Sequence, residues 1–203
     1  MDIKTVTRCH AAVCAAIGCG GALLFLFVFP IGSISTLMHD VLRLPGPGAG
    51  IALVLGPLVI LVALISILVS RGSVGALIGC LAFGLTCVVL VWLFRIPTNP
   101  KGAFGSPLLI AAVGLAGLVV EASELTAGAV ERPWRSILSG ALANAVLLAS
   151  YWIIIFPYTA DRVRWADVPL LLGLAIGSGA VWGYIADAVS NPLSVALARR
   201  EKE

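Results

Sequence analysis

Charged residues are scarce in this chain of 203 residues, because lysine, arginine, aspartate and glutamate together make up only 11% of it. In soluble globular domains the charged share is about a quarter. Apolar residues make up 60% of the chain, and the mean hydropathy is +1.08. The shortage of charge excludes an ordinary soluble domain and predicts an all-α polytopic membrane protein.

The residues and motifs of common catalytic sites are also scarce. His10 and His39 are the two histidines, and the chain contains neither an HExxH motif nor a GxxxxGK[ST] nucleotide-binding loop. The five cysteines lack the spacing of a metal site, so we interpret them as small packing residues. These absences predict a protein that is not an enzyme, has no catalytic residue, and binds no metal or other cofactor.

What the chain does contain is six runs of about twenty apolar residues. Such a run crosses the ~30 Å hydrocarbon core as a helix, the form in which a single segment satisfies its own backbone hydrogen bonds. We therefore predict one domain, a bundle of six transmembrane helices, in which the first span is retained because no small-residue cleavage site follows it. The predicted spans are Ala11–Ile31, Ala49–Ser70, Gly72–Phe94, Phe104 to about Val130, Ser136–Pro157 and Val168 to about Val189.

Lysine and arginine are distributed unevenly between the two sides of the predicted membrane. The side with both termini has eight and the other side five, which favours cytoplasmic termini in a plasma membrane. The net charge of +3 belongs to span ends that face lipid headgroups, so membrane lipid is an expected partner and nucleic acid is not. The eight are Lys4, Arg8, Arg71, Arg132, Arg135, Arg199, Arg200 and Lys202; the five are Arg43, Arg95, Lys101, Arg162 and Arg164.

Small residues recur at helical spacing in several spans. Ala12, Ala16 and Gly20 form one row along the first span, at positions i, i+4 and i+8. Such a row lets another helix backbone approach closely, either within the bundle or from a separate subunit. Similar pairs occur in the third and sixth spans: Gly75 with Gly79, Gly173 with Gly177, and Gly179 with Gly183.

Two glutamates lie near the inner end of the predicted fourth span. Glu121 and Glu124 are i, i+3 neighbours, so they share one face of a helix. Inside a membrane such carboxylates can bind a cation, recognise an amine or share a proton. If the span instead ends near Val120, both belong to a solvated or interfacial charge cluster; span length does not decide between these alternatives.

Four polar or aromatic residues are the candidates for substrate binding. Asn144, within the fifth span, needs a hydrogen-bond partner, either a neighbouring helix, water or a ligand. Tyr151 follows seven residues later on the same helical face, and Trp152 lies near the span end, where tryptophans also form interfacial belts. His39 lies in the outer loop Gly32–Gly48, whose prolines and glycines predict a defined shape that can act as a lid.

The overall pattern resembles the substrate-binding membrane subunits, or S-components, of energy-coupling factor type ABC transporters. The resemblance rests on the chain length, six spans, cytoplasmic termini, a long first outer loop, the row Ala12, Ala16 and Gly20, and a glycine-rich last span with a basic tail. It implies uptake of a small organic micronutrient such as a vitamin, together with a transmembrane scaffold subunit and ATPase subunits. It also implies that the small-residue row docks on the scaffold and that the first outer loop gates the site.

Two other functions remain open at this stage. A small structural or assembly subunit of a larger membrane complex would have the same apolar spans, with polar residues that only join helices. A proton- or cation-coupled carrier would use Glu121 and Glu124 as its coupling site and would need no ATPase. The internal repeats found in many carriers are not visible in this sequence.

Overall fold

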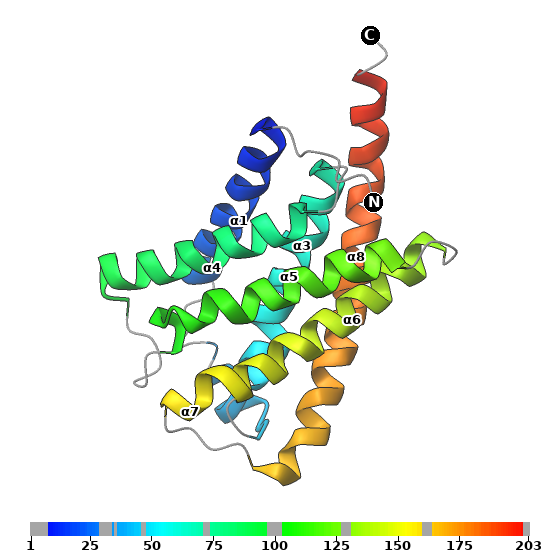
Figure 1. The fold of residues 1–203 in the computed structure, drawn as a ribbon. Coiled ribbons are helices and arrows are strands. Elements are labelled where there is room, and N and C mark those ends of the chain that lie inside the picture. The colour runs from blue at the N-terminus through cyan, green and yellow to red at the C-terminus, as the bar shows by residue number, and fades with distance from the viewer. Residues whose placement is uncertain are drawn as a thin grey trace.

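The computed structural model describes residues 8–28, 34, 36–45, 48–70, 74–96, 103–126, 131–159 and 164–200. Nearly all of these residues are helical, and no strand occurs among them. Within the described ranges, six helices are long and apolar enough to cross a membrane, and they pack together as a bundle (Figure 1). The prediction of an all-α polytopic membrane protein with six spanning helices is confirmed.

The spans begin and end close to their predicted positions, and three features were not predicted. A π-helical turn precedes α3 and another follows α6, and α8 continues past the predicted end of the sixth span. The predicted span ends at residues 29–31, 72 and 127–130 lie outside the described residues. The elements are α1 Arg8–Val28, a π turn Ile51–Leu55 leading into α3 Gly56–Ser70, α4 Gly75–Phe94, α5 Leu108–Thr126, α6 Arg132–Ser150, a π turn Tyr151–Ile155 leading into α7 Phe156–Thr159, and α8 Val168–Arg200.

Helix α3 is the centre of the bundle. Helices α1, α4, α5, α6 and α8 all pack against it, and none of residues 48–70 is exposed. Its sequence explains this position, because a helix that is apolar all round has no polar face to turn toward water. Figure 1 shows α4, α5 and α6 side by side in front of α3, with α1 and α8 on either side of it.

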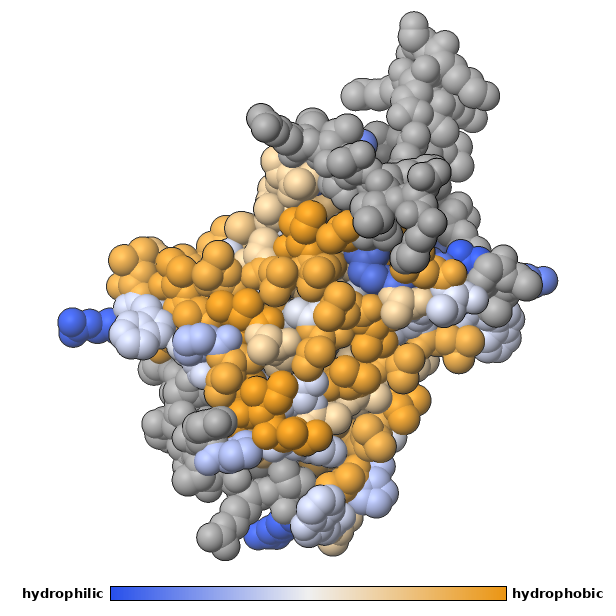
Figure 2. Space-filling view, in the orientation of Figure 1, coloured by the Kyte–Doolittle hydropathy of each residue, from blue (hydrophilic) through white to orange (hydrophobic). Residues whose placement is uncertain are grey.

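The surface of the bundle is apolar over its middle. Figure 2 shows hydrophobic residues across the face made by α4, α5 and α6, with hydrophilic residues at its margins. Because lipid chains solvate such side chains well, this face fits a bilayer interior. Large exposed apolar residues on these three helices are Leu81, Leu85, Val89, Trp92, Leu93, Phe94, Leu115, Leu118, Leu125, Trp134, Leu138 and Leu142.

The bundle has two ends, which contain different segments of the chain. The predicted outer end contains the segments around Gly48, Phe104 and Phe156, and the predicted inner end contains the start of α4 and the end of α5. A third π turn, Leu37–Val41, lies in the first loop at the predicted outer end. Of that loop, residues 32, 33, 35, 46 and 47 lie outside the described residues.

Candidate functional site

Asn144 joins three helices in the interior of the bundle. Its side chain on α6 is fully buried, and Nδ2 lies 2.9 Å from the Ala52 carbonyl oxygen, 2.9 Å from the Ala175 carbonyl oxygen and 2.9 Å from Ser178 Oγ. Two carbonyl oxygens require a donor, so the amide nitrogen must face them. The partner of Asn144 predicted from the sequence is therefore supplied by α8 and by the π turn before α3.

The Ala52 carbonyl is available because of the proline that follows its π turn. In this turn the Gly56 N–H donates to the Ile51 carbonyl, five residues back. The next residue in the same register is Pro57, which has no N–H to donate to Ala52. The Ala52 oxygen instead accepts hydrogen bonds from Asn144 Nδ2 and, at 2.6 Å, from Ser178 Oγ.

Gly56 is required beside this cluster. A Cβ atom at Gly56 would overlap Asn144 Oδ1, so no larger residue fits there without moving the amide. Oδ1 is buried and has no hydrogen-bond partner among the described residues. The cluster thus satisfies the donors of Asn144 and leaves its acceptor unpaired, which is unusual for a buried amide.

A series of aromatic rings crosses the predicted outer end of the bundle. Phe25 on α1 contacts Phe83 on α4, with ring centres 6.2 Å apart, and Phe104, with ring centres 5.6 Å apart. Phe104 lies 6.0 Å from the ring of Tyr151, which makes an edge-to-face contact with Phe156 at 5.3 Å. Tyr151 therefore lies within a continuous layer of aromatic rings, most of which are buried in the hydrophobic core.

Trp152 lies against the end of the first outer loop. Its indole Nε1 is buried and has no hydrogen-bond acceptor among the described residues. A Cβ atom at Gly48 would lie 3.2 Å from this nitrogen and 3.2 Å from Leu148 Cδ1, so Gly48 packs closely over the N–H and a larger residue would fit only if these neighbours shifted. Gly48 has φ of +156°, a value that also favours glycine.

The hydrogen bond of His39 lies within its own loop. It lies exposed in the π turn Leu37–Val41, and its Nδ1 is 3.0 Å from the Leu44 carbonyl oxygen. The Leu44 N–H in turn donates to the Met38 carbonyl. This bond orders the loop, and the predicted role of His39 in substrate binding stays a prediction.

Glu121 is directed at the start of another helix. Its side chain is 8% exposed, and Oε1 accepts hydrogen bonds from the backbone N–H of Ala76, at 2.7 Å, and of Leu77, at 3.4 Å. These are first-turn donors of α4, which have no partner within their own helix. A carboxylate also interacts favourably with the positive end of the helix dipole. Glu121 therefore caps α4 from a position 45 residues further along the chain.

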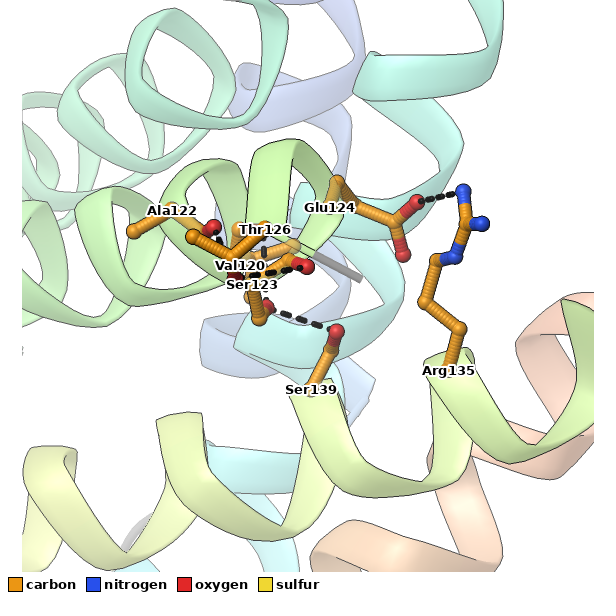
Figure 3. Close-up of polar contacts among 7 residues, drawn as sticks. All are labelled: Val120, Ala122, Ser123, Glu124, Thr126, Arg135 and Ser139. Carbon is orange, nitrogen blue, oxygen red and sulfur yellow. Dashed lines mark hydrogen bonds and ion pairs between the residues drawn. The ribbon is translucent and has the colours of Figure 1, made fainter. Parts of the chain in front are cut away.

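Glu124 has a different partner, although it lies one turn from Glu121. Its Oε2 lies 3.6 Å from Arg135 Nη1 on α6 (Figure 3). Between the same two helices, Ser123 Oγ and Ser139 Oγ are 2.6 Å apart. The two glutamates share a helix, but their carboxylates bind separate partners on α4 and α6.

The predicted small-residue row on α1 faces away from the bundle. Ala12, Ala16 and Gly20 are exposed, and no atom lies within 4 Å of a Cβ built at Gly20. The close contact with α4 is made instead by Gly18, where a Cβ would overlap the Gly79 carbonyl oxygen. Packing within the bundle, one of the two alternatives for the row, therefore uses a different face of α1.

Only one of the two predicted glycine pairs in the sixth span, Gly179 with Gly183, makes close contact with another helix of the bundle. A Cβ at Gly179 would overlap the Gly140 carbonyl of α6, and a Cβ at Gly183 would overlap the Ser136 carbonyl. Among the described residues, no atom of another segment lies within 4 Å of a Cβ added at Gly173 or Gly177. The helices α6 and α8 therefore approach at backbone contact through Gly140, a residue that the sequence analysis did not single out.

The described residues offer hydrogen bonds and aromatic surface rather than metal-ligand chemistry. In the part of the chain that the structure describes, no group of three or more His, Cys, Asp or Glu residues converges. Comparison with known proteins gave no matching protein-family profile, no matching curated protein and no matching solved structure. The features that can bear on function are therefore the Trp152 indole and the aromatic layer at the predicted outer end.

Proposed function

We propose that the protein is a membrane-embedded substrate-binding subunit for uptake of a small organic micronutrient. It would lie in a plasma membrane with both termini in the cytoplasm and work with a separate transmembrane scaffold and ATPases. The observation that carries this proposal is the buried, unpaired indole N–H of Trp152 beside the end of the first outer loop. A buried donor without an acceptor is costly, and a ligand acceptor at this point would satisfy it.

The surroundings of Trp152 support a ligand that is partly aromatic or apolar. Tyr151, its neighbour, belongs to the aromatic layer with Phe104 and Phe156. Small-molecule sites typically combine apolar and aromatic walls with a few oriented polar groups. In this proposal the aromatic layer provides the wall, and the indole N–H of Trp152 provides an orienting donor.

Replacing Trp152 with phenylalanine tests the ligand site. Trp152→Phe keeps an aromatic ring and removes the N–H, so we expect the amount of small molecule released on denaturing the purified protein to fall about tenfold, as for a lost hydrogen bond in a buried site. The readout is mass spectrometry of the released small molecules per mole of protein. Trp134→Phe is the control, because Trp134 is exposed. Equal ligand content in the two variants would contradict the assignment of Trp152.

The exposed row on α1 supports docking of a separate subunit. Ala12, Ala16 and Gly20 form a smooth strip that no other described element of the chain covers. Another transmembrane helix can approach such a strip closely, which is where helix association in lipid gains packing energy. We assign this strip to the transmembrane scaffold.

Leucine substitutions in this row test the docking surface. The double variant Ala12→Leu with Ala16→Leu should reduce co-purified scaffold and ATPase chains about tenfold, because bulky side chains keep the backbones apart. The amount of bound small molecule should stay at the wild-type level. The control is Ala111→Leu with Ala122→Leu, two exposed alanines on α5. Unchanged recovery of partner chains from the α1 variant, measured by quantitative mass spectrometry in mild detergent, would overturn the docking assignment.

We do not assign cation coupling to the two glutamates. The Glu121 carboxylate accepts hydrogen bonds from α4, and the Glu124 carboxylate is paired with Arg135. Each therefore has a partner that stabilises helix packing, which weighs against a carrier that loads a cation between them. If the co-purified chains include no ATPase, the structural-subunit function becomes the better proposal.

A further inference from the structure

The backbone of the second span is weakened at one point. The Gly56 N–H donates in the π register to Ile51, and Pro57 provides no N–H in any register. Proline and π-helical turns are the usual sites at which helices bend. Residues 48–55 are therefore joined to α3 through fewer backbone hydrogen bonds than a regular helix would have.

This outer part of the span is held from the side by two other helices. The Ala52 oxygen accepts from Ser178 Oγ of α8 at 2.6 Å and from Asn144 Nδ2 of α6 at 2.9 Å. Both donors also have a second acceptor within reach, the Ala175 carbonyl, at 3.2 Å from Ser178 Oγ and 2.9 Å from Asn144 Nδ2. If Ala52 moved away, both donors would keep a partner, and only one carbonyl would need a new donor.

The same segment covers Trp152. Gly48, its first residue, lies close to the indole nitrogen and to the side chains of Leu148 and Leu171. The Ala52 N–H donates to the Gly48 carbonyl at 2.8 Å, so the segment is continuous from Gly48 to the turn. A displacement at Ala52 would therefore be transmitted to the point where the segment meets Trp152.

We propose that residues 48–55 form a hinged gate over Trp152, with the hinge at Gly56–Pro57 and a latch made by Asn144 and Ser178. The identity of what passes the gate rests on the proposed function, but the motion itself does not. In the closed state the two donors hold the Ala52 carbonyl. In the open state they turn to Ala175, and the Ala52 carbonyl is hydrated or bonded to the ligand.

Hydrogen exchange of the ligand-free protein in nanodiscs, followed by mass spectrometry, tests the gate. In the wild-type protein, amides of residues 49–56 should exchange at least about tenfold faster than those of residues 60–70, because opening exposes this segment to water and its few backbone hydrogen bonds then break locally while residues 60–70 stay folded. Removing one latch donor with Ser178→Ala should raise exchange of residues 49–56 about three- to tenfold, the effect of one net hydrogen bond. Exchange of residues 60–70 should not change.

Two further variants make the result decisive. Ser139→Ala removes a hydroxyl that contacts Ser123 at the other end of α6, and it should leave exchange of residues 49–56 unchanged. Pro57→Ala restores a backbone donor and should slow that exchange at least about threefold. Equal exchange rates along the whole span in the wild type, or a Ser178→Ala effect spread over all of α3, would overturn the gate. Because no ligand is used, that outcome would leave the Trp152→Phe test of function independent.

Discussion

A Gly179→Val variant should yield almost no folded protein, whereas Gly177→Val should fold like the wild type. A Cβ at Gly179 would overlap the Gly140 carbonyl and lie 2.9 Å from Asn144 Cβ. The obstacle on α6 is backbone, which cannot relax as a flexible side chain does. Valine would therefore separate α6 from α8 and pull Ser178 and Asn144 apart, at a cost of about 3 kcal/mol or more.

The comparison with Gly177 isolates packing from helix propensity. Both glycines lie within α8, so the intrinsic effect of valine on the helix is the same in the two variants. At Gly177 no atom lies within 4 Å of an added Cβ, so the valine side chain would enter lipid. The measurement is the yield of monodisperse protein and its thermal midpoint in detergent. Similar yields for both variants would contradict the close approach of α6 and α8.

Glu121→Leu should destabilise the folded protein strongly. Leucine has about the same volume but leaves the buried Ala76 N–H and the partly buried Leu77 N–H without their acceptor. Two unpaired backbone donors in an apolar site cost about 2–4 kcal/mol in total. For a chain of this size, we expect the thermal midpoint to fall by about 4–16 °C, measured by a thermal shift assay in detergent.

The matched variants separate capping from charge. Glu121→Gln keeps an oxygen acceptor for α4, so we expect less than half of the loss caused by leucine. Glu124→Gln should have a small effect, because its ion pair with Arg135 is 3.6 Å long and partly exposed. A loss of stability for Glu121→Gln equal to that of Glu121→Leu would mean that the cap on α4 is not the main role of Glu121.

The sequence predicted the helices well because apolar length is a direct physical requirement of a bilayer. It also predicted that Asn144 would need a partner, and the structure identifies Ala52, Ala175 and Ser178 as that set. Ser178 was not recognised, because a serine in a span has many possible roles and its position relative to Ala52 depends on how three helices pack. The prolines that follow the two π turns were the signal that could have predicted those turns.

The orientation of α1 could not be predicted from its small residues. Ala12, Ala16 and Gly20 form one small face, and Gly18 lies on another. In a soluble protein polar residues would mark the outer face, but here lipid and protein interior are equally apolar. For the same reason, the sequence could not distinguish Gly179, which enters the interface with α6, from Gly177, which does not. The capping role of Glu121 could not be predicted from the sequence either, because its partners are backbone groups of a distant segment.

The position of α3 at the centre has a consequence for the order of synthesis. Four of the five helices that enclose it, α4, α5, α6 and α8, follow it along the chain. Before these helices are synthesised, α3 is surrounded by lipid, which solvates its apolar side chains well. The Ala52 carbonyl is the exception, since its donors lie 92 and 126 residues later. The hydrogen bonds of the Ala52 carbonyl are therefore complete only after α8 has been synthesised, so the final packing of this span depends on the last helix of the bundle.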